Sequence, residues 1–591
     1  MSFNISNEYE SQDYLSLNPH WIVVVLPLKF PVTYKRSSAT SFSQDYSQAV
    51  ALQAAVILTS EVQSIGVSST KGNHVGSLNA TLFPDKEFLS IINPGDYVFC
   101  WMMNDEETFR DVIDKLKKVT GHEVGDAPNG FRDGLKFYGR VNSIREQVQQ
   151  FPDGRRQARF LMNANSFTEL DATFFYEEHL SLLQAGPATQ IKKMNLEIDK
   201  IFDDSTGEAG IIPNQMIVSL IDVFLGKGVQ KNLGSGQEDP ALKSTFGTEG
   251  DYAHIVPELV GAILNKPDVS TRIQKTADII EVVHGIQHYS DSAAQEFGTK
   301  DSKTLYESFA PTGTNQTSSR RFTGENLLGR NTPVPPTLTN KPLWAVLNDY
   351  LNPSCNEMYA TLRANTEGKV VPTVIVRQMP FTTDAYTQAN VAATYFQELP
   401  RWKVPEIIVR DADIGRSDAL RFNFVHIYGT SDTIGARNAT QQIVDAPPYA
   451  DPLDIARSGL RPFMMTVPCW VNETREEQGP KKWMTLASDF IMGQQMTLTG
   501  ILHTVGIQTP VCVGDNLEWD GNLYHIESIS HSCQVSSDGK KNFSTTLGLT
   551  HGMGIDTFQS GDSTDLRLYA RVDSTKEEST FIPKLTVERK D

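Results

Sequence analysis

The sequence predicts a β-rich α+β protein that contains two related antiparallel β-barrel or sandwich domains, with a helical insertion and long loops. Two observations carry this prediction. Runs of β-branched residues broken by Pro and Gly occur at both ends of the chain, and one hairpin pattern occurs twice. The length of 591 residues agrees with more than one unit, because a single hydrophobic core rarely grows beyond about 250–300 residues.

The repeated hairpin pattern spans residues 95–165 and again 514–550. In each copy Gly-Asp precedes an apolar run, Ser-Ile follows, and Asp-Gly with a basic pair stands at the same distance beyond Ser-Ile. The turn residues are Gly95, Asp96, Asp153, Gly154, Gly514, Asp515, Asp538 and Gly539. Asp-Gly between two strand patterns is a strong hairpin signal, because glycine accepts the positive φ that the turn requires. The shared order and spacing favour a duplication, and a chance pairing of two common hairpins is the alternative.

The first copy carries extra residues between Asp96 and Ser143, and these have the pattern of a helix. Asn104 stands at the expected N-cap, Glu107 follows three residues later, and Gly121 closes the segment after three lysines. Apolar residues recur at helical spacing at Phe109, Val112, Ile113 and Leu116. The sequence therefore predicts a helix over about residues 104–121, inserted in the first domain.

Composition divides the chain into five segments. They are a polar N-terminal arm at 1–20, a first β-barrel-like domain at 21–180, a helical insertion with a loop rich in Gly, Ser, Thr and Pro at 181–340, a second β-barrel-like domain with insertions at 341–552, and an extended polar tail at 553–591. The helical insertion is predicted from apolar stretches of helical length such as "NQMIVSLIDVFLG". A short helix over 343–351 is expected to lead into the second domain.

Charge and cysteine content exclude some classes of protein. The net charge of −18 argues against general affinity for nucleic acid, because duplex binding requires Lys and Arg to neutralise phosphates. The five cysteines are odd in number and form no CxxC pair, which favours reduced thiols in a protein made in a cytoplasm. No signal peptide is visible, and the apolar run "WIVVVLPLKF" is too short to span a bilayer and predicts a strand.

Catalytic and metal-binding motifs are mostly missing: the chain has no GxSxG, no GxxxxGK and no GxGxxG. In "EVVHGIQH", Glu281, His284 and His288 would share one face of a helix, yet a zincin needs Glu directly after the first His, and Gly285 stands there. We interpret this segment as a packed helix. No catalytic residue, metal ligand or cofactor site is predicted.

A second segment, "DADIGRSDALRF", begins like a calcium loop. It has Phe422 where the bidentate Glu belongs and lacks the glycine at the sixth position. We interpret Asp413 and Asp418 as turn residues, with Arg416 paired nearby. Paired carboxylates for sugar cleavage remain open in principle, because the chain has 71 acidic residues.

The C-terminal third resembles the baseplate hub proteins of phage tails. The segment "VGDNLEWDGNLYHIESISHSCQVSSDGKKNFSTTLGLTHG" is similar to the closing strands of such hubs, as are "PTVIVRQMPF" and "DIGRSDALRFNFV". The similarity covers about 200 residues well, the first barrel only loosely, and the central region not at all. Such hubs are trimers in which two tube-protein-like barrels per chain adapt a six-fold tail tube to a three-fold spike.

The resemblance implies a structural protein of a contractile tail rather than an enzyme. It implies a homotrimer with the tail tube protein, the central spike protein and other baseplate proteins as partners, and DNA only passing through the channel. It further implies a place in the virion after assembly in the host cytoplasm, and no stable membrane insertion. The alternatives are a tail-associated peptidoglycan hydrolase and a carbohydrate binder, the latter disfavoured because the seven Trp are scattered.

Overall fold

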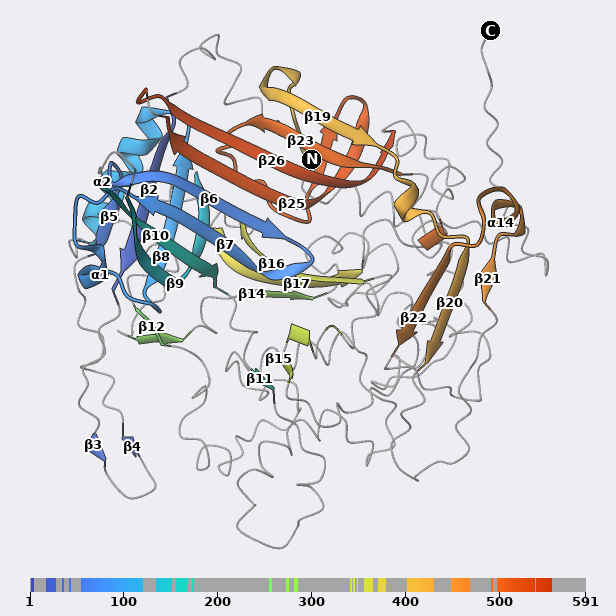
Figure 1. The fold of residues 1–591 in the computed structure, drawn as a ribbon, viewed down its shortest axis with the longest axis horizontal. Coiled ribbons are helices and arrows are strands. Elements are labelled where there is room, and N and C mark those ends of the chain that lie inside the picture. Colours follow the sequence, from blue (N-terminus) through green and yellow to red (C-terminus); the bar gives the residue numbers. More distant parts are fainter. Residues whose placement is uncertain are drawn as a thin grey trace, which may run out of the picture.

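A computed structural model shows a molecule dominated by one large, strongly curved sheet, with smaller sheets beneath and beside it (Figure 1). The β-rich α+β class that the sequence predicts is confirmed. The residues that the structure describes are 2–4, 18–27, 35–36, 42–43, 55–120, 134–150, 156–167, 173–174, 255–257, 273–275, 281–284, 341–342, 344–345, 348, 356–364, 370–378, 401–429, 448–467, 491–492, 497–536 and 538–554.

The first half of the large sheet, here called the first unit, has seven strands in the order β6-β7-β10-β9-β8-β2-β5. Their bounds are β2 His20–Leu26, β5 Val56–Leu58, β6 Val62–Thr70, β7 Asn73–Leu82, β8 Tyr97–Met103, β9 Leu135–Gln150 and β10 Arg156–Ser166. Two helices accompany them, α1 at Phe88–Ile91 and α2 at Glu106–Thr120. All the strand pairs in this unit are antiparallel.

The other half of the sheet, the second unit, has the order β19-β23-β26-β25-β24-β18-β1. Its strands are β1 Ser2–Asn4, β18 Arg401–Lys403, β19 Val409–Gly415, β23 Leu498–Val505, β24 Asn516–Trp519, β25 Asn522–Val535 and β26 Lys541–Gly554. The strands β1, β18 and β24 are parallel to one another, and the remaining pairs are antiparallel.

Five strands follow the same order in both units. The order β6-β7-β10-β9-β8 in the first corresponds to β19-β23-β26-β25-β24 in the second, and this is the order that a duplication predicts. Irregularities correspond as well. The ladder of β9 with β10 shifts between Asn163 and Ala164, and that of β25 with β26 shifts at the equivalent place, between Ile526 and Ser528.

A second irregularity is shared by the outermost strands. The ladder of β6 with β7 shifts between Val62 and Ser64, and that of β19 with β23 shifts between Val409 and Asp411. A bulge inserts one residue into one strand of a pair and keeps its place within a family of related folds. Two bulges at equivalent places therefore fix the residue-by-residue correspondence of the units: β9 with β25, and β6 with β19.

Each unit wraps around its own core. The core of the first unit is filled by residues from all seven strands and by Phe88 of α1, and it also takes in Cys533 and Phe543 from the second unit. The core of the second unit includes Tyr359 and Ile375 from a smaller sheet. Within the described residues, no strand pair closes either unit into a complete barrel, because the far edge of β6 is bonded to β25 of the other unit.

Five smaller sheets complete the described part of the chain. One has the order β14-β17-β16 and another β21-β20-β22, and the remaining three are the pairs β11-β15, β12-β13 and β3-β4. The bounds are β3 Lys35–Arg36, β4 Phe42–Ser43, β11 Thr173–Phe174, β12 Ile255–Pro257, β13 Ile273–Lys275, β14 Glu281–His284, β15 Lys341–Pro342, β16 Asn356–Ala364, β17 Val370–Gln378, β20 Phe424–Gly429, β21 Tyr449–Ala450 and β22 Pro462–Val467. Helix α14 spans Pro452–Ser458, and short 3-10 turns cover Glu406–Ile408 and Asp418–Leu420.

The prediction of helices at 181–340 is wrong for the parts of that segment that the structure describes. Its described pieces β12, β13 and β14 are all strands. In β14, Val282 and Val283 pair in parallel with Val374 and Ile375 of β17. A short apolar run fits a helix or a buried strand equally well by periodicity, and here the β-branched residues and the available sheet edge decide. The rest of 181–340 lies outside the described residues.

Helix α2 forms where the sequence predicts it, but its cap is a different residue. The carboxylate of Asp105 accepts a hydrogen bond from the Thr108 backbone N–H at 2.6 Å, so Asp105 is the N-cap. Asn104 is buried instead, and its side chain donates to the Gly506 carbonyl at 2.7 Å. In the described part of the chain no helix is long and apolar enough to cross a membrane.

Candidate functional site

The two Gly-Asp turns have the same geometry in both units. Gly95 has φ +94° and its N–H donates to the Val141 carbonyl at 2.7 Å, while Gly514 has φ +87° and donates to the Ile526 carbonyl at 2.8 Å. In return Val141 donates to Asp96 and Ile526 to Asp515, at 2.8 and 3.0 Å. Glycine is needed at both positions, because a side chain is strained at this φ. Each turn thus fixes the start of a strand against the middle of its long neighbour.

The aspartates of these turns are buried and serve as local caps. The Asp96 carboxylate accepts from the Asn93 N–H at 2.7 Å, and the Asp515 carboxylate accepts from the Cys512 N–H at 3.1 Å. Asp515 also accepts from the indole N–H of Trp402 at 2.8 Å, which ties β18 to the turn. These carboxylates are occupied by backbone and indole donors, so they organise the fold rather than perform chemistry.

The Asp-Gly turns are described in one unit. Gly539 has φ +79°, its N–H donates to the Ser536 carbonyl at 2.9 Å, and the Asp538 carboxylate accepts from the Lys540 N–H at 3.2 Å. This is a tight turn between β25 and β26. Asp153 and Gly154 lie outside the described residues.

The two units are joined by a continuous seam of backbone hydrogen bonds. Residues 64–70 of β6 pair antiparallel with residues 528–534 of β25, the half of that strand nearer its hairpin turn. Just beyond the ladder, the Lys71 N–H donates to the Glu527 carbonyl at 3.0 Å. The seam makes one sheet of the two units.

Buried polar side chains reinforce the seam. The Lys71 ammonium is nearly buried and pairs with Glu357 of β16 and, at 3.2 Å, with Glu527. Lys136 donates to the carbonyls of Gln508 and Thr509 at 2.9 and 2.8 Å. Sequence reasoning missed these residues, because no local pattern reveals partners that lie hundreds of positions away in the chain. The shared bulges that align the units were equally invisible.

Three histidines have lowered pKa values, and one of them, His531, lies on the seam strand β25. Burial, assisted by the Lys136 ammonium, lowers the pKa of His531 well below its ordinary value. Burial and the Lys71 ammonium lower the pKa of His551 to about 3. Burial and the Lys541 ammonium also lower the pKa of His20. Because a protonated imidazole is costly at these positions, we expect these histidines to lower the stability of the fold as the pH falls.

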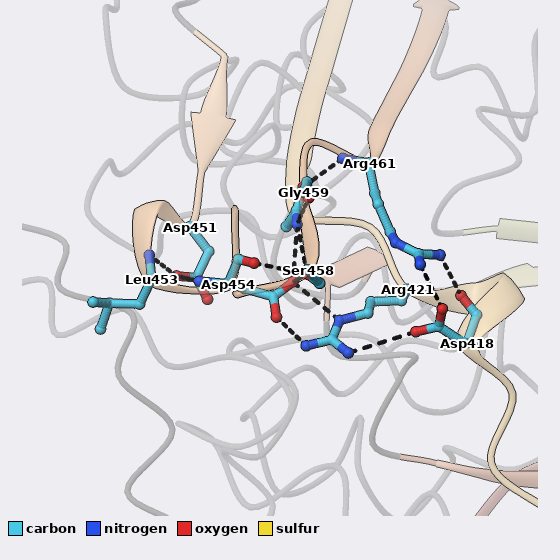
Figure 2. A network of polar contacts seen from close by, with 9 residues as sticks. Asp418, Arg421, Asp451, Leu453, Asp454, Ser458, Gly459 and Arg461 are labelled. Carbon is cyan, nitrogen blue, oxygen red and sulfur yellow. Dashed lines mark hydrogen bonds and ion pairs between the residues drawn. The ribbon is translucent and has the colours of Figure 1, made fainter. Parts of the chain in front are cut away.

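A separate polar network lies in the small sheet β21-β20-β22 with helix α14 (Figure 2). Arg421 pairs with Asp454 and with Asp418, and Arg461 pairs with Asp418 at 2.6 Å. The side chain of Asp451 caps α14 by accepting from the backbone N–H groups of Leu453 and Asp454 at 3.0 Å. Asp418 therefore shapes this turn as expected, but its ion-pair partners are Arg421 and Arg461, whereas the sequence suggested Arg416.

This network has the electrostatics of a structural cluster. The hydrogen bond from Arg421 is the main cause that lowers the pKa of Asp454, and Asn423 and Ser458 donate to the same carboxylate. A general acid in sugar cleavage requires the opposite shift, toward a raised pKa. Within the described ranges, no group of three His, Cys, Asp or Glu side chains is placed to hold a metal. Glu281 and His284 lie on strand β14, and His288 is outside the described residues.

Comparisons with known proteins find similarity in structure alone. No protein-family model matches the chain, and no curated protein matches its sequence. The solved structures that it resembles are phage tail proteins and VgrG complexes. The 43 kDa tail protein of prophage MuSo2 from Shewanella oneidensis is 12% identical, with a TM-score of 0.33, over 84% of this chain and 96% of that one.

Two further solved structures have similar scores. A tail protein from Neisseria meningitidis MC58 is 9% identical, with a TM-score of 0.34, over 84% of this chain and 93% of that one. The half-lidded PdpA-VgrG complex from Francisella is 9% identical, with a TM-score of 0.34, over 90% of this chain and 58% of that one. Similarity at these scores does not assign a function to this chain.

Proposed function

We propose that this chain is the structural hub of a phage tail baseplate, which adapts a hexameric tail tube to a trimeric central spike and forms part of the DNA channel. The observation that carries the proposal is the repeated five-strand unit, joined by the seam into one sheet. Two equivalent units in one chain let a trimer present six similar elements in a ring, which matches a six-fold partner on one side and a three-fold partner on the other.

The carboxylates at the turns and in the Asp-Arg network support a role without catalysis, because each is bound by backbone N–H groups or arginines. The acidic net charge of −18 fits a channel that DNA passes without being held. In this proposal the partners are two further copies of the chain, the tail tube protein, the central spike protein and other baseplate proteins. The protein belongs to the virion tail after assembly in the host cytoplasm.

The test combines the native mass of the purified full-length chain with electron microscopy and a peptidoglycan-degradation assay on the same sample. We expect a trimer, ring-shaped with three-fold symmetry and six similar lobes, and no wall degradation. A stable monomer at micromolar concentration that degrades peptidoglycan would replace the hub with the alternative, a tail-associated hydrolase.

A further inference from the structure

The two strands that form the seam, β6 and β25, each have an equivalent strand in the other unit, and these two equivalents are not paired with each other in the structure. Strand β6, outermost in the first unit, pairs with residues 528–534 of β25 in the second unit. The opposite combination consists of β19, outermost in the second unit, and residues 143–150 of β9 in the first (Figure 1). Among the described strands, β19 pairs with β23 alone, and this half of β9 pairs with β10 alone.

We propose that β19 of one copy of this chain pairs, antiparallel, with residues 145–149 of β9 in a second copy. The contact repeats between chains the seam that each chain already makes within itself. It rests on the assembly proposed above and adds to it the two strands that meet. A contact of this kind is heterologous, since different surfaces of the two copies meet, and its repetition forms a ring when the rotation between copies closes after three of them.

The shared bulges predict the register of this contact. They align Ile65 of β6 with Ala412 of β19, and Cys533 of β25 with Val148 of β9. Ile65 is opposite Cys533 in the internal seam, so Ala412 is expected opposite Val148. By the same transfer, Asp411, Asp413, Ile414 and Gly415 are expected opposite Gln149, Gln147, Glu146 and Arg145.

Burial shows what the second copy would cover. Along β25 buried and exposed residues alternate from Ile529 to Gln534, as expected for a strand with one face in a core. In β9 every residue from Arg145 to Gln150 is exposed, and Val148 is 43% exposed where its counterpart Cys533 is fully buried. Strand β19 is exposed from Arg410 to Asp413. Long exposed edges invite pairing and are normally covered.

Side-chain chemistry fits the predicted register. Ala412 and Ile414 fall on the face of Ile144 and Val148, so these four apolar residues share one side of the pair, together with Glu146 opposite Ile414. On the other face Asp413 stands diagonal to Arg145, within reach of an ion pair across the strands. Neither strand brings a like charge directly opposite another, since Asp411 and Asp413 face Gln149 and Gln147.

Engineered disulfides test the contact and its register. The double variant A412C/V148C of the full chain, oxidised and run on a non-reducing gel, should give covalent oligomers that disappear on reduction, because directly opposite strand positions approach disulfide distance. The matched control A412C/Q149C places the second thiol on the other face and should give at least ten-fold less cross-linked product. The single variants report any linkage through native cysteines.

A second variant separates assembly from cross-linking chemistry. V148K places a charge in the predicted contact and should raise the dissociation constant of the assembly at least ten-fold, measured by native mass over a dilution series. Q150K adds the same charge to the same strand just outside the contact and should leave the native mass unchanged.

The outcomes distinguish this contact from the proposed function. An assembled chain in which A412C/V148C cross-links no better than the control, or in which V148K still assembles, would overturn the contact and leave the hub standing. Specific cross-links within dimers or open chains would support the contact and overturn the trimeric hub. A monomer at all concentrations would overturn the contact, whatever other protein covers these edges.

Discussion

Residues 143–150 of β9 and 528–535 of β25 occupy equivalent places in two equivalent units. They differ in what lies along their second edge. Both segments follow a bulge and precede a hairpin with the same registers. The segment in β25 pairs with β6, and its residues Ile529, His531 and Cys533 are buried. Among the described strands, the segment in β9 pairs only with β10, its hairpin partner, and most of its side chains are exposed.

The difference shows that burial along a strand is set by what pairs with it, not by the hairpin that contains it. His531 and Glu146 illustrate this, because they are counterparts in the two strands. A buried histidine hydrogen-bonded to Thr545 at 2.9 Å suits the covered position, and a polar glutamate side chain suits the exposed one. The sequence of each strand is therefore suited to the strand or solvent beside it. Variants at equivalent positions of the two units test this difference.

The largest difference is expected between the two Gly-Asp turns. At Gly514 a Cβ would lie 2.0 Å from the hydroxyl oxygen of Tyr359, which is fully buried, whereas at Gly95 nothing lies within 4 Å. Gly95→Ala should lose about 1–2 kcal/mol from the positive φ alone. Gly514→Ala adds about 1–3 kcal/mol for overpacking. Thermal unfolding of the two variants measures this, and equal losses would show that Tyr359 moves aside.

The next effect concerns the aspartates of the same turns. Asp515→Ala leaves two donors without this acceptor, the Cys512 N–H and the Trp402 indole, while Asp96→Ala removes the acceptor of one, the Asn93 N–H. An unsatisfied buried donor costs about 1–3 kcal/mol, so Asp515→Ala should lower the unfolding temperature more. Asp515→Asn keeps an acceptor oxygen and should recover part of the loss. If Asp96→Ala proves the worse variant, Trp402 contributes little.

The buried histidine of this pair, His531, predicts a pH dependence of stability. Because the pKa of His531 is lowered on folding, the unfolded chain binds more protons below about pH 6.5, and stability is fully present above that pH and falls as the pH drops. Each such group contributes up to about 1.4 kcal/mol per pH unit in this window. His20 and His551, whose pKa values are also lowered, add to the slope.

Variants at these two positions isolate the contribution of His531. Unfolding temperatures measured between pH 7 and pH 5 should fall less steeply for His531→Gln than for the unmodified chain. Glu146→Gln, at the exposed counterpart, should leave the slope unchanged. A slope that His531→Gln does not alter would show that His531 does not carry the acid sensitivity.

Sequence reasoning found the repeated unit because its signals are local. Glycine at positive φ, a capping aspartate beside it and a fixed distance to the hairpin turn all lie within one stretch of chain, at Gly95-Asp96 and Gly514-Asp515. Helix α2 was found in the same way, by its period and its acidic first turn. Its cap was misplaced by one residue, because Asn104 and Asp105 are both good caps and a contact with Gly506 decides between them.

The remaining features depend on partners distant in the chain. Nothing near Lys71 indicates Glu357, and nothing in "EVVH" indicates that β17 offers an edge to pair with. The apolar content of the segment predicts burial correctly as a tendency, but not which element buries it. The seam between β6 and β25 could not be predicted for the same reason, because the sequence pattern of a strand does not identify the strand that pairs with it.

The smallest effect is expected at Val148, and it depends on the state of assembly. Cys533→Ser places a hydroxyl in the fully buried counterpart position and should cost about 1–3 kcal/mol under all conditions. Val148→Ser changes an exposed side chain and should cost less than about 0.5 kcal/mol in the dissociated chain. If a second copy covers Val148 with Ala412, the cost should rise with protein concentration, because binding to the folded state adds to its stability. Thermal unfolding of both variants over a dilution series measures this. A cost at Val148 that is large at every dilution would mean that the strand is already covered within one chain.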